Sequence, residues 1–290
     1  MAINILVTGS NGQLGMCIRH EANSFAQYHF IYASKAELAI DNETVLLYFF
    51  EKYKPKFCIN CAAYTAVDKA EVERELAYVA NVTGPQLLAQ ACAQYGCMLI
   101  HLSTDYVYDG SKQQPYVPSD VTTPINYYGN TKALGEQAVL STYANSIVIR
   151  TSWVYSAYGK NFVKTMVNLM AHNESIHVVN DQIGSPTYAP NLAQAILRVI
   201  NQCVHNNDMP KGIYHYADEG IISWYTLALE VKNCIGSSCN IMPIPTSSYP
   251  TPATRSTYSV LDTSLMVQHY GVVVQPWQLG VAACVSVLAK

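Results

Sequence analysis

The sequence predicts an α/β fold with a doubly wound parallel sheet and a smaller, partly interleaved C-terminal region. Strand-length apolar runs alternate with helical stretches over the first 180 residues. Of the 290 residues, 50% are hydrophobic and only 13% are charged, which is enough apolar material for a large buried core. After about Asp181 the pattern changes, because turns interrupt short helices.

The elements follow in order along the chain. Strands are predicted at residues 3–7, 30–33, 57–61, 98–102, 147–150 and 176–179. Helices are predicted at residues 12–20 and 45–53, and as one long amphipathic helix over residues 75–95. Residues 109–126, rich in Pro, Ser, Thr and Asp, are predicted to form a loop. Because such alternation places helices on both faces of a parallel sheet, residues 1–180 should form mainly the sheet domain. Residues 181–290 should form mainly the second region, with the chain crossing between the two.

Bulk properties exclude several classes of protein. The formal net charge of −3 disfavours a nucleic-acid partner, which usually calls for a basic surface. No signal peptide or membrane-spanning run is visible, so we expect a cytoplasmic protein with free thiols. The nine cysteines are scattered, and the pair Cys58 and Cys61 is interpreted as core packing. The eight histidines show no metal-ligand spacing, so no metal is predicted.

A glycine-rich loop follows the first predicted strand, with Gly9, Gly12 and Gly15 at every third position. One glycine suits the tight turn, one lets the backbone approach a pyrophosphate, and one lets the helix pack on the strand. The helix N-terminus favours phosphate. The motif therefore predicts a dinucleotide site in a Rossmann-type domain; a purely structural turn is the alternative.

The end of the second strand bears on the choice of cofactor. An NAD site usually has an acid there for the ribose hydroxyls, whereas this chain has Ser34 and Lys35 and no acid before Glu37. Ser34 and Lys35 could receive a 2′-phosphate, which favours NADPH and leaves NADH possible. The alternative for Lys35 is a solvated surface lysine.

Tyr128 and Lys132 lie four residues apart at the start of a predicted helix, so their side chains share one face. A nearby ammonium should lower the pKa of the phenol, giving a group that can donate a proton to a ketone. Thr104 ends the fourth strand, where ligands of open α/β sheets bind, and could hydrogen-bond a carbonyl oxygen. Each feature alone has an ordinary structural explanation, but their order together favours an oxidoreductase.

These motifs resemble the dTDP-4-dehydrorhamnose reductase family of extended short-chain dehydrogenases/reductases. The resemblance rests on residues 9–15, 60–71, 103–106, 128–132, 150–155, 180–187 and 250–255. It implies NAD(P)H-dependent reduction of a dTDP-linked keto-sugar, dTDP-4-dehydro-L-rhamnose, to dTDP-L-rhamnose, a precursor of cell-surface polysaccharide. It leaves a homodimer open.

The resemblance also implies roles. Tyr128 would be the general acid, Lys132 would lower its pKa and hold the nicotinamide ribose, and Thr104 would orient the ketone. The implied cofactor-binding residues are Gly9, Asn11, Gly12, Gln13, Leu14, Gly15, Ser34, Lys35, Ile40, Ala62, Ala63, Thr65, Tyr128 and Lys132. The implied substrate-binding residues are Val67, Thr104, Asp105, Tyr106, Trp153 and Arg255.

Alternatives and departures from the family remain. Trp153 could be a core residue, and Arg255 could instead pair with a surface acid. Where some relatives carry metal-binding glutamates, this chain has Cys17 and Gln278. An epimerase or dehydratase of the same fold, or a non-catalytic regulatory subunit, would share the glycine loop. The run 104–106 lacks the glutamate of dehydratases, and a binding subunit has no need of Tyr128.

Overall fold

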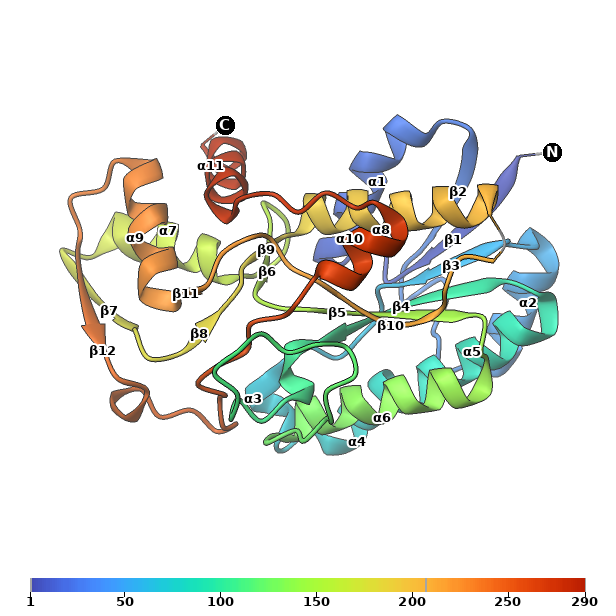
Figure 1. Ribbon diagram of the computed structural model, residues 1–290, viewed down its shortest axis with the longest axis horizontal. Coiled ribbons are helices and arrows are strands. Elements are labelled where there is room, and N and C mark those ends of the chain that lie inside the picture. Colours follow the sequence, from blue (N-terminus) through green and yellow to red (C-terminus); the bar gives the residue numbers. More distant parts are fainter. Residues whose placement is uncertain (1, 207, 290) are drawn as a thin grey trace.

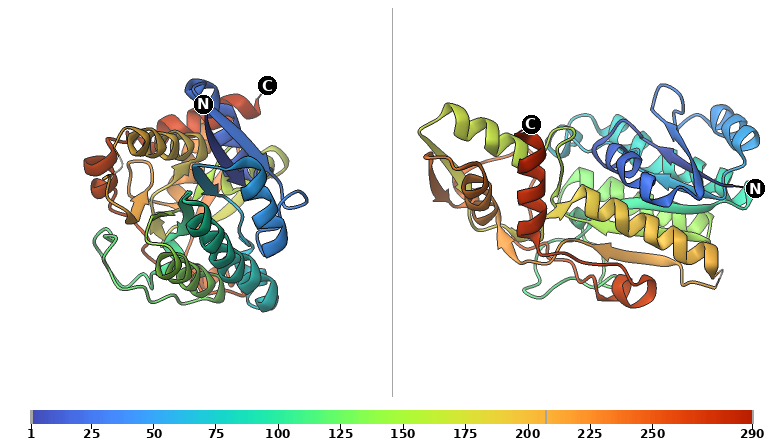
Figure 2. Two further views of the ribbon diagram at one scale, coloured as in Figure 1. Left: turned by 90° about the vertical axis from the view of Figure 1, so that its right-hand side faces the viewer. Right: turned by 90° about the horizontal axis from the view of Figure 1, so that it is seen from above.

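The computed structural model describes residues 2–206 and 208–289 and confirms the α/β class. Six parallel strands form the central sheet in the order β10-β5-β4-β3-β1-β2. Helices cover both faces (Figures 1 and 2). The strands are β1 (Ile3–Thr8), β2 (Tyr28–Ala33), β3 (Phe57–Asn60), β4 (Met98–Thr104), β5 (Ser146–Thr151) and β10 (Gly212–Tyr216).

Alternating apolar side chains build a core on each side of the sheet. In β1, Ile5 and Val7 point to one face and Leu6 to the other, as the two-residue period of a strand requires. One face is covered by α1 (Gln13–Glu21) and α8 (Ala189–His205). The opposite face is covered by α2 (Glu43–Tyr53), α5 (Gly84–Tyr95) and α6 (Tyr127–Thr142).

The prediction of a sixth strand at residues 176–179 was wrong about its partner. The strand exists as β7 (Ser175–Val179), but it pairs in parallel with β12 (Asn240–Ile244) outside the central sheet. The sixth strand of the central sheet is β10, which pairs with β5. Its sequence, Gly-Ile-Tyr-His-Tyr, lacks the aliphatic run of a central strand, and its three aromatic residues are nevertheless buried.

A smaller lobe lies at the end of the molecule opposite the N-terminus (Figure 1). Its core joins α7 (Phe162–His172), α9 (Trp224–Ile235) and α11 (Trp277–Leu288) with β7 and β12. Short pairings of β6 (Val154–Tyr155) with β9 (Thr187–Tyr188), and of β8 (Ile183–Gly184) with β11 (Ile222–Ser223), lie between the two parts of the chain. The short helix α10 (Ser264–Tyr270) packs near β10. The chain thus passes into the lobe before residue 180 and returns to the sheet with α8 and β10.

The predicted long helix over residues 75–95 is interrupted. It consists of α4 (Arg74–Tyr78), a π-helical turn η2 (Val79–Thr83) and α5. Buried Asn81 in that turn accepts from the Tyr64 amide (2.9 Å) and donates to the Tyr64 carbonyl (3.0 Å) and the Thr131 hydroxyl (3.0 Å). The π turn therefore fixes the segment after β3 against α6, a common use of such turns near functional sites.

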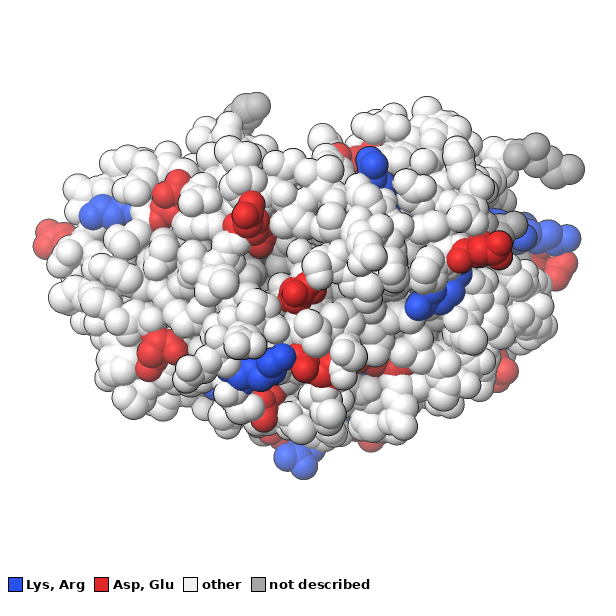
Figure 3. Space-filling model, viewed as in Figure 1, with Lys and Arg blue, Asp and Glu red and all other residues white. Residues whose placement is uncertain are grey.

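The surface carries charges of both signs, and the hydropathy of the helices bears on whether the chain could cross a membrane. On the face shown in Figure 3, acidic and basic side chains are spread among uncharged ones, and several lie next to a side chain of opposite charge. Within residues 2–206 and 208–289, no helix has both the length and the apolar character that a bilayer crossing would require.

Candidate active site

Two adjoining cavities lie at the carboxyl ends of the central strands. The first, of about 580 Å³, is lined by the glycine loop, residues 34–36 and the segment after β3; we call it the glycine-loop cavity. The second, of about 680 Å³, contains Thr104, Tyr128 and Lys132; we call it the tyrosine cavity. Both are lined by Gly12, Cys61 and Ala63, so they form one continuous cleft.

The three glycines of the loop have different surroundings. Gly9 adopts a left-handed φ of +62°, and a Cβ there would lie 2.6 Å from the Ala62 nitrogen. A Cβ on Gly15 would lie 2.6 Å from the Ser10 Cα, so its lack of a side chain lets α1 pack on the loop. Gly12 precedes α1 without any side-chain cap. The first amides of α1 are therefore free to bind an anion.

Gln13 and Leu14, the first residues of α1, line the tyrosine cavity. The Gln13 amide group donates to the Val154 carbonyl (3.1 Å) and accepts from Asn161 (2.8 Å). These bonds connect the glycine loop to β6 and to the N-terminus of α7. Asn11 lines the glycine-loop cavity with Gly9 and Gly12.

The far end of the glycine-loop cavity contains Ser34, Lys35 and Ile40. The Ser34 amide (2.8 Å) and hydroxyl (2.7 Å) both donate to the Glu37 carboxylate, and these bonds lower the pKa of Glu37. Both hydrogen-bond donors of Ser34 are thus used by Glu37. In the sequence, Glu37 lies beyond the end of the second strand, where an acid for the ribose was sought. Exposed Lys35 is the cation on this wall.

The segment after β3 forms the opposite wall. Ala62 and Ala63 line the glycine-loop cavity, and Thr65 lines the tyrosine cavity. The Ala62 amide donates to Asn60 (3.2 Å), whose side chain also bonds Thr8 and His101. Cys58 is a core thiol, but β3 ends at Asn60, so Cys61 lies beyond the strand and lines the cleft.

Thr104, Tyr128 and Lys132 come together on one side of the tyrosine cavity, and all three are nearly buried. Asn126 caps α6 by accepting from Gly129, which starts the helix at Tyr127 and sets both side chains on the face toward β4. Gly129 allows this packing, because a Cβ there would collide with the Tyr106 carbonyl. The Lys132 ammonium donates to the Leu102 carbonyl (2.6 Å).

The pKa of Tyr128 differs from the sequence prediction. Burial raises it, a hydrogen bond between Tyr128 and Thr104 opposes the rise, and nearby Asp105 and Tyr106 raise it further. Lys132 is not among the groups that shift it, and burial lowers the pKa of Lys132 itself to about 8. The phenol is therefore protonated at neutral pH, which is the form that a proton donor requires.

The tyrosine cavity is also lined by Val67, Asp105, Tyr106 and Trp153, which the resemblance implies as contacts of the sugar. Trp153 has a left-handed φ of +48° and stacks on Trp224 with 3.6 Å between ring centroids. Burial raises the pKa of Asp105 to about 6, against hydrogen bonds from Ser259 and Thr104. Trp224 was missed because it lies on α9, far along the chain.

Arg255 does not line either cavity. Its guanidinium pairs with Asp68 (2.9 Å) and donates to the Ala253 carbonyl (3.0 Å), while lying 5.8 Å from the Tyr106 ring centroid. The structure therefore contains the alternative arrangement, in which Arg255 pairs with an acid. Any contact with a phosphate would require Arg255 to exchange or share Asp68.

Residues 159–161 are further cleft residues that sequence reasoning missed. Gly159, Lys160 and Asn161 line the tyrosine cavity beside the glycine loop. Asn161 caps α7 and also bonds Gln13, so this loop is held against the start of α1. No local motif marks it, because its position depends on the packing of α7.

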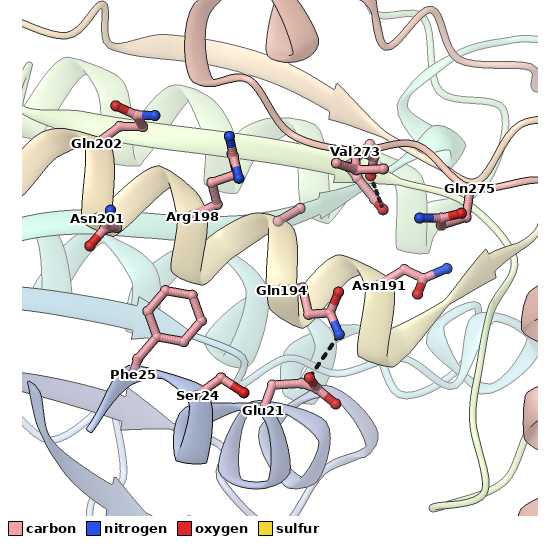
Figure 4. Close-up of a pocket in the computed structure, with 12 residues that line it drawn as sticks. Glu21, Ser24, Phe25, Asn191, Gln194, Arg198, Asn201, Gln202, Val273 and Gln275 are labelled. Carbon is pink, nitrogen blue, oxygen red and sulfur yellow. Dashed lines mark hydrogen bonds between the residues drawn. The ribbon is translucent and has the colours of Figure 1, made fainter. Parts of the chain in front are cut away.

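A third cavity lies outside this cleft. A polar cavity of about 330 Å³ between α1 and α8 is lined by several carboxamides and Arg198, and Gln194 donates to Glu21 across it at 2.8 Å (Figure 4). Within residues 2–206 and 208–289, no group of three or more His, Cys, Asp or Glu side chains could hold a metal ion. Cys17 is buried in the core and Gln278 is exposed.

The chain matches the family model described as the RmlD substrate binding domain over residues 3–290. It is 36% identical over 280 residues to a dTDP-4-dehydrorhamnose reductase of Aggregatibacter actinomycetemcomitans, covering 94% of this chain and 95% of the relative. The crystal structure of a dTDP-4-dehydrorhamnose reductase from Clostridium acetobutylicum superposes with a TM-score of 0.94 at 36% identity, covering 99% of this chain and 100% of the other.

The crystal structure of the Bacillus anthracis dTDP-4-dehydrorhamnose reductase in complex with NADP has a TM-score of 0.91. It is 36% identical to this chain and covers 99% of both. The match therefore extends over the sheet domain and the smaller lobe together. This chain belongs to the dTDP-4-dehydrorhamnose reductase family.

Proposed function

We propose that this protein reduces the 4-keto group of dTDP-4-dehydro-L-rhamnose to give dTDP-L-rhamnose, with NADPH as the reductant. The observation that carries the proposal is the meeting of Thr104, Tyr128 and Lys132 in a cavity continuous with the glycine loop. Family membership over nearly the whole chain supports the choice of substrate. It likewise supports a role in rhamnose and polysaccharide biosynthesis.

The cleft fits a dinucleotide. A Cβ on Gly9 or Gly15 would collide with neighbouring backbone, so only glycine allows the tight loop that forms one wall of the cleft. The uncapped start of α1 supplies amides for a pyrophosphate. Ala62, Ala63 and Ile40 offer small or apolar surfaces for the adenine end.

The reduced nicotinamide supplies a hydride to the carbonyl carbon of the sugar. The Thr104 hydroxyl, which donates to Asp105 in this structure, would turn to donate to the carbonyl oxygen and hold it near the Tyr128 hydroxyl. Tyr128 would transfer its proton to that oxygen as negative charge develops there. The resulting buried phenolate needs a nearby positive charge, which the Lys132 ammonium would supply from the same helix face.

Sugar selection would come from the aromatic side of the tyrosine cavity. The stacked pair of Trp153 and Trp224 presents a flat surface suited to the C–H face of a hexose. Asp105 and Tyr106 offer polar atoms for its hydroxyls, and Val67 supplies an apolar contact. Arg255, at the edge near Tyr106, is the proposed partner of the nucleotide diphosphate.

The decisive experiment is an assay of the purified protein with a panel of nucleotide-linked keto-sugars and both reduced cofactors. The expected result is stoichiometric oxidation of NADPH with the dTDP-linked 4-keto-sugar. Product formation without net cofactor consumption would instead indicate an epimerase. Tight cofactor binding without turnover on any sugar would indicate the non-catalytic subunit.

We also propose a cytoplasmic location. All nine cysteines are free thiols, which is the state that a reducing compartment maintains.

Lys35 gives a test of cofactor preference. Lys35→Ala should weaken NADPH binding about fivefold and NADH binding much less, because an exposed ion pair with the 2′-phosphate contributes about 1 kcal/mol. Glu37→Gln should act in the opposite direction, since it removes the carboxylate bound to Ser34. Fluorescence titration of each cofactor measures both changes. Equal losses for the two cofactors would place Lys35 on the solvated surface.

A further inference from the structure

A buried ion pair lies beneath the proposed catalytic lysine and is not used in the mechanism above. Glu136 and Arg150 are 3% and 2% exposed, respectively. The Arg150 Nε lies 2.9 Å from Glu136 Oε1 and 3.1 Å from Oε2, and Nη2 lies 2.6 Å from Oε2. Burying two charges is costly unless both are fully hydrogen-bonded, so such a pair calls for an explanation.

The pair is attached directly to the reacting end of β4. The Ser103 hydroxyl donates to Glu136 Oε1, and Ser103 immediately precedes Thr104. Glu136 also lies four residues after Lys132 on α6, on the same helix face. One carboxylate therefore adjoins both the strand end that carries Thr104 and the helix face that carries Lys132.

On its other side, Arg150 reaches residues 109–126. Its Nη1 donates to the Tyr108 hydroxyl (2.5 Å) and to the Pro118 carbonyl (3.3 Å). The Tyr108 hydroxyl lies 2.9 Å from His215 Nε2 on β10, and His215 Nδ1 lies 3.0 Å from the Tyr116 carbonyl. Burial lowers the pKa of His215 to about 3, so it is neutral and adds no charge to the network at neutral pH.

We propose that Glu136 is a positioning residue for the reduction: held by Arg150 and Ser103, its carboxylate fixes the end of β4 beside Thr104 and places a negative charge on the buried face of α6 that carries Lys132. This inference rests on the proposed function. It assigns a task to a residue that does not touch the cleft, since neither Glu136 nor Arg150 lines the tyrosine cavity.

The charges around Lys132 support this assignment. Burial lowers the pKa of Lys132 to about 8, and the Glu136 carboxylate opposes that fall. His101 on β4 is kept neutral by burial and by the lysine itself. The other titratable groups around Lys132 are Cys61 after β3, Asp105 and Tyr106 of the 3₁₀ turn after β4, Tyr128 on α6, Arg150 on β5 and Lys160 before α7. Of these neighbours, the Glu136 carboxylate is the group whose charge raises the pKa of Lys132.

The test is the pH profile of Glu136→Gln, which keeps the shape of the side chain and removes its charge. Without the carboxylate, and with Arg150 left unpaired, the pKa of Lys132 should fall by roughly one unit. The alkaline limb of kcat should then move about one pH unit toward acid. At pH 8 the charged fraction of the lysine would fall from about one half to about one tenth, a loss of about fivefold in kcat.

Glu136→Asp is the matched control, because it keeps the charge and shortens the side chain. Its alkaline limb should stay within a few tenths of a pH unit of wild type, even if thermal stability falls. If Glu136→Gln does not fold, the double variant Glu136→Gln/Arg150→Met carries the test, because it leaves no unpaired buried charge. The alkaline limb of kcat for this double variant should lie between the limb of wild type and the limb expected for Glu136→Gln. If the Glu136–Arg150 pair were purely structural, all variants would lose stability and the alkaline limb of kcat would stay at the wild-type pH in each of them. That result would overturn the proposal.

A second readout does not depend on turnover. In protein labelled with ¹³C at lysine Cε, the resonance that is lost in Lys132→Met should titrate near pH 8 in the wild type and at lower pH in Glu136→Gln. An unchanged titration midpoint would overturn the inference even if wild-type reductase activity is present. Absence of keto-sugar reduction by the wild type would instead refute the proposed function, whatever the lysine titration shows.

Discussion

Replacing Tyr128 by phenylalanine is expected to lower kcat by about 10²–10⁴-fold. The substitution removes one oxygen and keeps the ring, which packs edge-on against Tyr106 at 5.5 Å between centroids. NADPH affinity should stay within about twofold, because the hydroxyl matters only when the proton moves. Steady-state kinetics and cofactor titration together measure this separation.

Tyr127→Phe is the matched control for this variant. Tyr127 begins the same helix and its ring lies 4.8 Å from the Arg74 guanidinium, but it does not line the tyrosine cavity. Its loss of a hydroxyl should leave kcat nearly unchanged. Turnover of Tyr128→Phe equal to that of the control would remove Tyr128 from the proposed chemistry.

Replacing Gly9 by alanine should damage both stability and cofactor binding. A left-handed backbone costs alanine about 1–2 kcal/mol, and the added Cβ would meet the Ala62 backbone at 2.6 Å. Together with the overpacking, the free energy of unfolding should fall by about 2–4 kcal/mol. NADPH affinity should fall at least tenfold, because relieving the collision separates the two loops that line the glycine-loop cavity.

Gly96→Ala separates the two causes. Gly96 has nearly the same φ, +61°, but a Cβ there would have no heavy atom within 4 Å. This variant should lose only the conformational part, about 1–2 kcal/mol, and bind NADPH like wild type. Chemical denaturation and fluorescence titration check both glycines. If the two variants behave alike, the close approach of Gly9 to Ala62 has no role in the cleft.

The motifs of the cleft could be predicted from sequence because each depends on neighbouring residues. The glycine spacing and the Tyr128–Lys132 interval act within one turn or one helix, where backbone geometry fixes what residues three or four apart can reach. Strand-length apolar runs likewise predicted five strands of the central sheet. The strand predicted at residues 98–102 continues in the structure to Thr104.

The missed features depend on residues that are distant in sequence. Trp224 reaches Trp153 only because α9 packs against the lobe, and the loop at residues 159–161 reaches Gln13 only through Asn161. The tyrosine-rich strand β10 is recognised by its pairing with β5 rather than by its own composition.

The fold class, the glycine loop and the candidate threonine, tyrosine and lysine could all be predicted from the sequence, since they follow from local spacing and from a resemblance spread along the chain. The protonation of these side chains depends on how the chain packs around them. The pKa of Tyr128 is raised rather than lowered, and Lys132 is supported by Glu136 within a buried network. The physical reason is that desolvation depends on everything packed around a group, which spacing within one helix does not reveal.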